Sequence, residues 1–164
     1  VLDFQDYFVR RRAEPVVTAL EYRGAAAARP PAAVLAALAS PDLGAVVVCP
    51  SNPWLSVDPI LAVGGLRDAL RASGVPIVGV CPLIGGRAVK GPTAKIMAEL
   101  GIEATPAAIA AHYGDVLDGL VIDEADRGWA GRCGIPTRVS RTLMSDDRRR
   151  LALAAEVLDF AASL

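Results

Sequence analysis

Four short runs of apolar, largely β-branched residues constrain the fold of this chain more than any other feature. The runs are Ala45–Cys49, Pro76–Val80, Leu120–Ile122 and Ile135–Val139, the last of which also carries Thr137 and Arg138. Continuous apolar runs of this length are typical of strands that are buried on both faces, as in a parallel sheet. Because helical patterns alternate with the runs, the sequence predicts an α/β, Rossmann-like three-layer fold with a mainly parallel sheet.

The segments between these runs carry helix start and stop signals. Pro31 and Pro92 suit the first turn of a helix, and Gly101 suits the position after its end. The sequence predicts helices over residues 32–39, 60–72, 92–100, 105–112 and 146–162, and a further short strand over residues 16–22. No linker divides the chain, so residues 1–164 are expected to form one α/β domain.

The start of the chain suggests a piece of a longer protein. Its first residue is Val1 rather than methionine, and the chain begins abruptly in the dense segment Phe4–Phe8. We therefore expect a fragment of a larger α/β domain.

Charge and cysteine content exclude several classes of function. The net charge is −1 without a long charge run, which disfavours extended nucleic acid or an anionic membrane as a partner. No apolar run reaches the length of a membrane helix. Cys49, Cys81 and Cys133 form no CxxC pair, which argues against a disulfide framework or a zinc site. Cys49 and Cys81 are expected to be small buried side chains in a reducing, cytoplasmic protein.

Polar residues follow all four predicted strands. They are Ser51 and Asn52, then Gly85, Gly86 and Lys90, then Asp123, Glu124 and Asp126, then Ser140, Arg141 and Thr142. Open α/β sheets bind ligands beyond the carboxyl ends of their strands. If the strands are neighbours, these four loops should meet at one rim and form a site.

The second of these groups lies in a glycine-rich segment that holds the only two lysines, Lys90 and Lys95. Backbone amides and a lysine ammonium beside a helix start can hold a phosphate. The segment is not a Walker A motif, because Pro92 stands where that motif has lysine. The alternative is a solvated surface loop.

Three other groups have both a functional and a structural interpretation. The rigid turn Pro50–Pro53 could present Ser51 and Asn52 to a phosphate, ribose or base, or could simply join a strand to a helix. Asp123, Glu124 and Asp126 are weak magnesium candidates, since acids also commonly begin helices. The segment Arg10–Arg12 suits phosphate contacts, an oligomer interface or a solvated face. Trp54 and the single histidine, His112, are expected to be structural.

Taken in order, these motifs resemble the 2-phospho-L-lactate transferase family of deazaflavin biosynthesis. The resemblance rests on Phe4–Arg12, Pro50–Pro53 with Pro59–Leu61, Gly85–Pro92, His112–Asp115 and Asp123–Asp126. It covers nearly the whole chain, which looks like the C-terminal portion of a family member.

The resemblance implies a step in making coenzyme F(420). Such an enzyme transfers a phospholactyl or phosphoenolpyruvyl group from its guanosine-diphospho-activated form to the deazaflavin Fo, and GMP leaves with the assistance of magnesium. It implies a nucleotide or phosphate role for Ser51, Asn52, Gly85, Gly86, Lys90 and Gly91, and more loosely for Arg11 and Arg12. The catalytic and metal-binding residues are expected outside this chain, and a homodimer is possible.

Two other functions compete with this hypothesis. The first is a non-catalytic nucleotide- or phosphate-binding α/β module. The second is a dinucleotide-binding dehydrogenase domain, which the lack of a GxGxxG motif after a strand disfavours.

Overall fold

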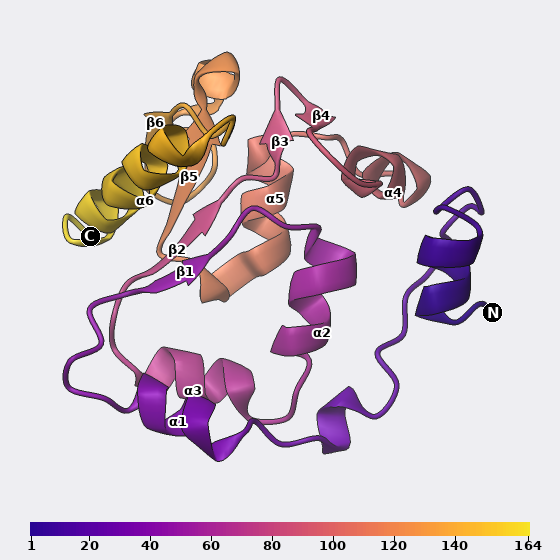
Figure 1. The fold of residues 1–164 in the computed structure, drawn as a ribbon, viewed down its shortest axis with the longest axis horizontal. Helices are drawn as coiled ribbons and strands as arrows, with labels where there is room; N and C mark the ends of the chain where they lie inside the picture. Colours follow the sequence, from indigo (N-terminus) through magenta and orange to yellow (C-terminus); the bar gives the residue numbers. More distant parts are fainter.

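The sheet predicted from the apolar runs is present. The computed structural model describes residues 1–164. It contains four parallel strands in the order β1-β2-β5-β6, which are β1 (Val46–Val48), β2 (Ile77–Val80), β5 (Gly119–Asp123) and β6 (Thr137–Ser140). The strands run side by side toward the upper part of the molecule in Figure 1. The α/β prediction is therefore confirmed.

Helices cover both faces of this sheet. They are α1 (Ala32–Leu38), α2 (Asp58–Leu61), α3 (Leu66–Ala72), α4 (Thr93–Glu99), α5 (Pro106–Tyr113) and α6 (Asp147–Ala161). Alternate residues of a strand point to opposite faces. Accordingly, Val78 and Val121 pack in one cluster with Val157 of α6, whereas Ile77 and Leu120 pack in the larger core on the other face. The result is the expected three-layer arrangement.

Two local signals position the last helices as expected. The Thr105 side chain accepts a hydrogen bond from Ala108 N (3.1 Å), and the Asp146 side chain accepts one from Arg149 N (2.8 Å). Such N-cap bonds satisfy amides that have no partner within the helix. Gly119 lets α6 approach β5, because a Cβ at that position would lie 2.8 Å from Phe160 Cε1.

The single helix predicted over residues 60–72 is wrong. The segment forms two helices, α2 and α3, separated at Gly64 and Gly65. Gly65 has a φ of +83°, and a Cβ on Gly64 would lie 2.5 Å from Ala26 O. The backbone therefore turns where only glycine fits.

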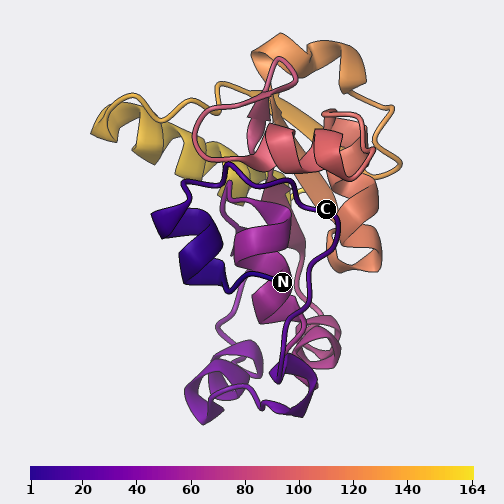
Figure 2. The ribbon, with the colours of Figure 1, turned by 90° about the vertical axis from the view of Figure 1, so that its right-hand side faces the viewer.

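The strand predicted over residues 16–22 is also absent. This stretch is an extended coil that runs down the molecule in Figure 2. Its backbone is held by side chains instead of a strand: Val17 N donates to Glu99 Oε2 (3.0 Å), and Lys95 Nζ donates to Pro15 O (3.0 Å).

Two further expectations near strand ends need correction. The glycine-rich segment contains a hairpin, β3 (Leu83–Ile84) and β4 (Arg87–Ala88), and Lys95 lies within α4. Cys81 is buried as expected, but Cys49 is exposed, because β1 is an edge strand whose end is not covered. None of the helices combines the length and the apolar content needed to cross a membrane.

Candidate functional site

Loops at the carboxyl ends of β5 and β6 are joined through Asp123. Its carboxylate accepts hydrogen bonds from Ala125 N (3.0 Å) and from both the amide and the hydroxyl of Thr142 (2.9 Å each). Burial would raise the pKa of Asp123, but these hydrogen bonds outweigh burial and lower it below its ordinary value. Asp123 is therefore an ionised acceptor that holds two rim loops together.

A second buried acid joins the β5 loop to the hairpin. Asp126 Oδ2 accepts a hydrogen bond from Gly85 N (2.8 Å). Gly85 and Gly86 have φ angles of +58° and +70°, which give the type I′ turn of a two-residue hairpin. In this structure the two glycines form a tight turn, and the Gly85 amide already has an anionic partner.

The three acids proposed as weak magnesium candidates do not form a metal site. Asp123 and Asp126 accept bonds from different loops, and Glu124 pairs with Arg141 (3.3 Å). No group of three histidine, cysteine or carboxylate side chains is arranged to hold a metal ion. The residues present therefore do not fit magnesium.

The Pro50–Pro53 turn contains a hydrogen-bond donor without a partner. Asn52 Oδ1 accepts a bond from Leu55 N (3.0 Å) and caps the helical turn Pro53–Val57. Asn52 Nδ2 is buried and has no hydrogen-bond partner, while the neighbouring Ser51 is half-buried. Buried donors without a partner are rare in native proteins, which singles out this carboxamide.

A polar network supports this turn from behind. Asp58 lies 2.9 Å from His112 Nε2, and Tyr22 donates its hydroxyl to Trp54 O (2.7 Å). The Trp54 ring is buried and lies 4.6 Å from the His112 ring. Both residues are structural, as expected, and they fix the helical turn that follows Asn52.

The arginine segment near the N-terminus and the start of α4 border an open surface pocket of about 490 Å³. Its lining residues are Phe8, Arg12, Ala13, Gly91, Pro92 and Lys95. The structure thus brings Arg12 and Gly91 to one pocket, although 78 residues lie between them in the sequence. We call this surface pocket the α4 pocket.

Charge and backbone strain both concentrate at the α4 pocket. Arg12 and Lys95 supply two cations, and the Lys95 ammonium also pairs with Glu99. Arg12 and Ala13 have φ angles of +51° and +57°, and they are the only non-glycine residues in the left-handed region. Strain of this kind is concentrated at ligand-binding sites.

A third unusual feature lies beside the pocket. The Tyr7 hydroxyl is buried without a hydrogen-bond partner, and it and Asn52 Nδ2 are the only two such side-chain atoms in the chain. Burial raises the pKa of Tyr7, although the Lys95 charge partly opposes this shift. Both unsatisfied groups therefore belong to motifs that the sequence singled out.

Other predicted site residues lie outside this pocket. Arg11 pairs with Asp6 (3.0 Å), and Lys90 is exposed in the loop before α4 without a salt-bridge partner. No hydrogen bond joins Ser51 or Asn52 to the rim loops that Asp123 and Asp126 connect. Hydrogen bonds thus join three of the four loops, and the fourth follows β1, which lies beside β2 in the same parallel sheet.

Sequence reasoning missed the roles of Lys95 and Phe8 in lining the pocket. Lys95 follows Pro92 by three residues, so it lies on the first turn of the predicted helix near the loop glycine. Residues three or four apart on a helix share a face, and that spacing was the signal available. Phe8 stacks on Phe4 with ring centroids 5.4 Å apart, a pairing that the i, i+4 spacing permits.

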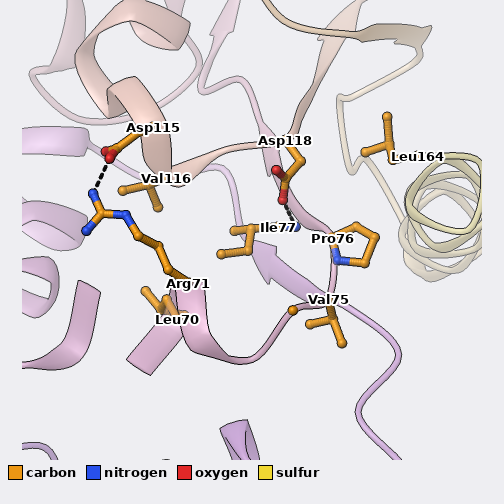
Figure 3. A pocket seen from close by; sticks show the side chains of 10 residues that line it. Leu70, Arg71, Val75, Pro76, Ile77, Asp115, Val116, Asp118 and Leu164 are labelled. Carbon is orange, nitrogen blue, oxygen red and sulfur yellow. Dashed lines mark hydrogen bonds and ion pairs between the residues drawn. The ribbon is translucent and has the colours of Figure 1, made fainter. Parts of the chain in front are cut away.

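A second cavity, of about 360 Å³, lies at the opposite, amino-terminal end of the sheet (Figure 3). Its lining charges are already engaged: Arg71 pairs with Asp115, and Asp118 accepts a hydrogen bond from Ile77 N (2.8 Å). Ligands of open α/β sheets bind at the other end of the strands. We therefore place the candidate site at the α4 pocket and the Asn52 turn.

Comparison with known proteins identifies the same family as the ordered motifs in the sequence. The family described as 2-phospho-L-lactate transferase CofD matches residues 1–132. The chain belongs to this family. The residues that match CofD include the α4 pocket, the Asn52 turn and both buried acids, whereas β6 and α6 lie beyond the matched range.

Individual CofD relatives have two different names. A phosphoenolpyruvate transferase of Streptomyces griseus is 39% identical over 98% of this chain, and the match covers 51% of the relative. One from Thermobifida fusca is 38% identical over 99% of the chain and covers 49% of that protein. A 2-phospho-L-lactate transferase of Methanocaldococcus jannaschii is 31% identical over the full chain and covers 51%. This chain spans about half the length of the relatives it matches.

Proposed function

We propose that this chain forms part of a transferase in coenzyme F(420) biosynthesis. The enzyme moves a phosphoenolpyruvyl or phospholactyl group from its guanosine-diphospho-activated form to the hydroxyl of the deazaflavin Fo, and GMP is released. Family membership supports the reaction class. The observation that carries the proposal is the α4 pocket, where Arg12 and Lys95 face one cavity.

The chemistry of the proposed reaction suits these side chains. Transfer at phosphorus depends on positioning the substrates and neutralising charge, and it needs no nucleophilic side chain. In this proposal Arg12 and Lys95 bind phosphate oxygens of the activated donor, and Arg12 can do so with two parallel N–H donors. Asn52 Nδ2 donates a hydrogen bond to the nucleotide, which satisfies the buried amide.

Magnesium is assigned no ligand in this chain. The acids Asp123, Glu124 and Asp126 hold loops together and do not converge. The magnesium that the reaction class calls for would supply charge neutralisation at the phosphates. Its ligands would then come from outside these 164 residues.

Calorimetric titration with GDP, with and without magnesium, tests the proposed donor subsite. We expect saturable binding, and we expect Arg12→Ala to weaken it by about 1.5–3 kcal/mol, the range for hydrogen bonds to charged groups. Arg23→Ala is the matched control, because Arg23 is an exposed arginine paired only with Glu21 (3.2 Å). Equal affinity of the Arg12 variant and the wild type, with both folded, would remove the α4 pocket from the proposal.

A nucleotide-binding module without catalysis is the second candidate, and the scattered acids favour it for the chain taken alone. A chimaera separates the two: this chain replaces the matching half of the Streptomyces griseus relative. We expect the chimaera to release GMP only when Fo and magnesium are both present. If the chimaera binds GDP but releases no GMP from either the enolpyruvyl or the lactyl donor, the transferase is excluded. The non-catalytic nucleotide-binding module is then the remaining candidate.

A further inference from the structure

The coil of residues 13–22 contacts both parts of the candidate site. At its start, Ala13 lines the α4 pocket. At its end, the Tyr22 hydroxyl donates a hydrogen bond to Trp54 O (2.7 Å), in the helical turn that Asn52 caps. The coil, which runs down the molecule in Figure 2, therefore connects the pocket to the Asn52 turn, and we call it the strap.

Side chains from other elements hold the strap, because its own backbone makes few bonds. No backbone–backbone hydrogen bond involves residues 15–21, and only Ala13 and Val17 of the strap are buried. Val16 is 69% exposed. A segment with few backbone hydrogen bonds and little buried apolar surface belongs to the least stable part of a fold. The position of the strap should therefore depend on the few side chains that anchor its ends.

Two side chains of α4 anchor the pocket end of the strap. Lys95 Nζ donates to Pro15 O (3.0 Å), and Val17 N donates to Glu99 Oε2 (3.0 Å). The Lys95 ammonium also pairs with Glu99, and a lysine ammonium carries three N–H donors. One donor of Lys95 is thus left for an anion in the α4 pocket, while the strap holds the other side of the same ammonium.

Tyr22 and Asp58 anchor the end of the strap at the Asn52 turn. Asp58 Oδ2 lies 3.3 Å from the Tyr22 hydroxyl oxygen and 2.9 Å from His112 Nε2. Burial and, next, the Asp58 charge raise the pKa of Tyr22 above its ordinary value, so the phenol keeps its proton and remains a donor to Trp54 O. Satisfied polar networks of this kind rigidify the segment that they hold. Tyr22 therefore fixes the turn in which Asn52 Nδ2 is buried without a partner.

We propose that the strap makes the α4 pocket and the Asn52 turn cooperate in binding the nucleotide. Tyr22 is a positioning residue that acts through Asn52, and the strap carries the effect of the Lys95 anchor to the same turn. The inference rests on the proposed function for the identity of its ligand. The link between Lys95 and Asn52, however, is a property of the chain without a ligand, so it can be tested without GDP.

Hydrogen exchange resolved to single amides tests the link in the free chain. The Leu55 amide is the reporter, because it donates to Asn52 Oδ1 (3.0 Å). We expect Tyr22→Phe and Lys95→Met each to speed the exchange of this amide by about two- to tenfold, the effect of one lost hydrogen bond. Lys95→Met acts from the far end of the strap, so a purely local role of Tyr22 would not reproduce its effect.

Two controls separate the strap from a general loss of stability. Lys90→Met removes the only other lysine, which does not anchor the strap, and should leave the exchange of the Leu55 amide unchanged. The Arg149 amide has the same kind of capping bond, to Asp146 Oδ1 (2.8 Å), and should exchange equally in all variants. Unchanged exchange at Leu55 in Lys95→Met, or equal acceleration at Leu55 and Arg149, would overturn the proposal.

Titration with GDP tests the role of Tyr22 in binding through a double-mutant cycle. We expect Tyr22→Phe to weaken the affinity of the wild type about fivefold and that of Asn52→Ser by less than about twofold, because Tyr22 acts through the Asn52 donor. An equal loss in both backgrounds would overturn this role, since a merely structural Tyr22 would weaken both alike. If the wild type binds no GDP, the proposed function fails, while exchange at Leu55 still decides whether the strap links the two regions.

Discussion

The loops that Asp123 and Asp126 join differ from the α4 pocket and the Asn52 turn in how their polar groups are satisfied. At the rim, Asp123 and Asp126 are buried, and protein donors occupy their carboxylates. In the second region, the Tyr7 hydroxyl and Asn52 Nδ2 have no partner, and Arg12 has a strained backbone. Both regions follow strands or carry charged motifs, so residue type alone does not separate them. The difference teaches that the satisfied polar groups hold the fold here, while the unsatisfied ones lie in the motifs for which we propose ligand contacts.

Replacing the rim acid should have the largest effect and should spare the ligand. We expect Asp123→Ala to lower the free energy of unfolding by about 3 kcal/mol, because two amides and the Thr142 hydroxyl lose a charged acceptor. Affinity for GDP should stay unchanged. Urea unfolding and calorimetric titration of the same variant measure the two quantities. A large loss of affinity at unchanged stability would reverse the roles of the two regions.

The acid dependence of stability sharpens the same prediction. The pKa of Asp123 is below its ordinary value of 3.8 in the folded chain, so the ionised carboxylate contributes stability above that pH. This contribution is lost as the pH falls from 3.8 through the folded pKa. Urea midpoints of the wild type should therefore decline over that interval more steeply than those of Asp123→Ala. If the urea midpoints of the two proteins decline in parallel as the pH falls, ionisation of Asp123 does not contribute to the stability.

In the second region, stability and binding should change in opposite directions. We expect Arg12→Gly to weaken GDP binding by about 1.5–3 kcal/mol through the lost guanidinium. The same change should raise the free energy of unfolding by about 0.5–1 kcal/mol, because glycine adopts a positive φ without strain.

Ala13→Gly provides the control for Arg12→Gly, since Ala13 shares the strain but has no charge. It should raise stability by a similar amount and leave the affinity for GDP intact. Thermal unfolding and titration of both variants give the four values needed. Destabilisation by both glycines would mean that the left-handed backbone is held at no cost.

The sequence predicted the architecture well because its signals are local. The apolar runs mark the strands, and Thr105 and Asp146 cap helices through atoms three residues away. Gly85 and Gly86 show where local signals become ambiguous, since paired glycines suit both a phosphate-binding loop and a type I′ turn. The Asp126 carboxylate accepts a hydrogen bond from the Gly85 amide 41 positions away, and no local pattern specifies a contact at that separation.

The candidate site was predicted only in part for the same physical reason. Arg12 and Gly91 were recognised by residue type, but their meeting in one pocket depends on the coil that anchors to Glu99 and Lys95. That coil has the composition of a strand but pairs with none of the strands of the sheet. Backbone strain at Arg12 is likewise a tertiary property and leaves no mark in the sequence.

A smaller effect is expected at the Pro50–Pro53 turn. Asn52→Ser keeps an oxygen that can accept the Leu55 amide and removes the unpaired carboxamide donor. We expect affinity for GDP to fall by about 1 kcal/mol and stability to change by less than that. Titration and urea unfolding test both parts. Ser56→Ala, at an exposed position four residues along the same turn, is the control and should change neither quantity.

The smallest effect is expected at Lys90, although the sequence suggested a phosphate-binding role for its segment. Lys90 is exposed and is not among the residues that line the α4 pocket, so solvent and salt screen its charge. Lys90→Ala should weaken GDP binding by no more than about 1 kcal/mol at low salt, and by less at high salt. Titrations at two ionic strengths measure this difference. A loss of GDP affinity that is independent of salt and as large as that of Arg12→Gly would place the phosphate at the Lys90 loop. The presence of unsatisfied polar groups would then not predict where the ligand binds.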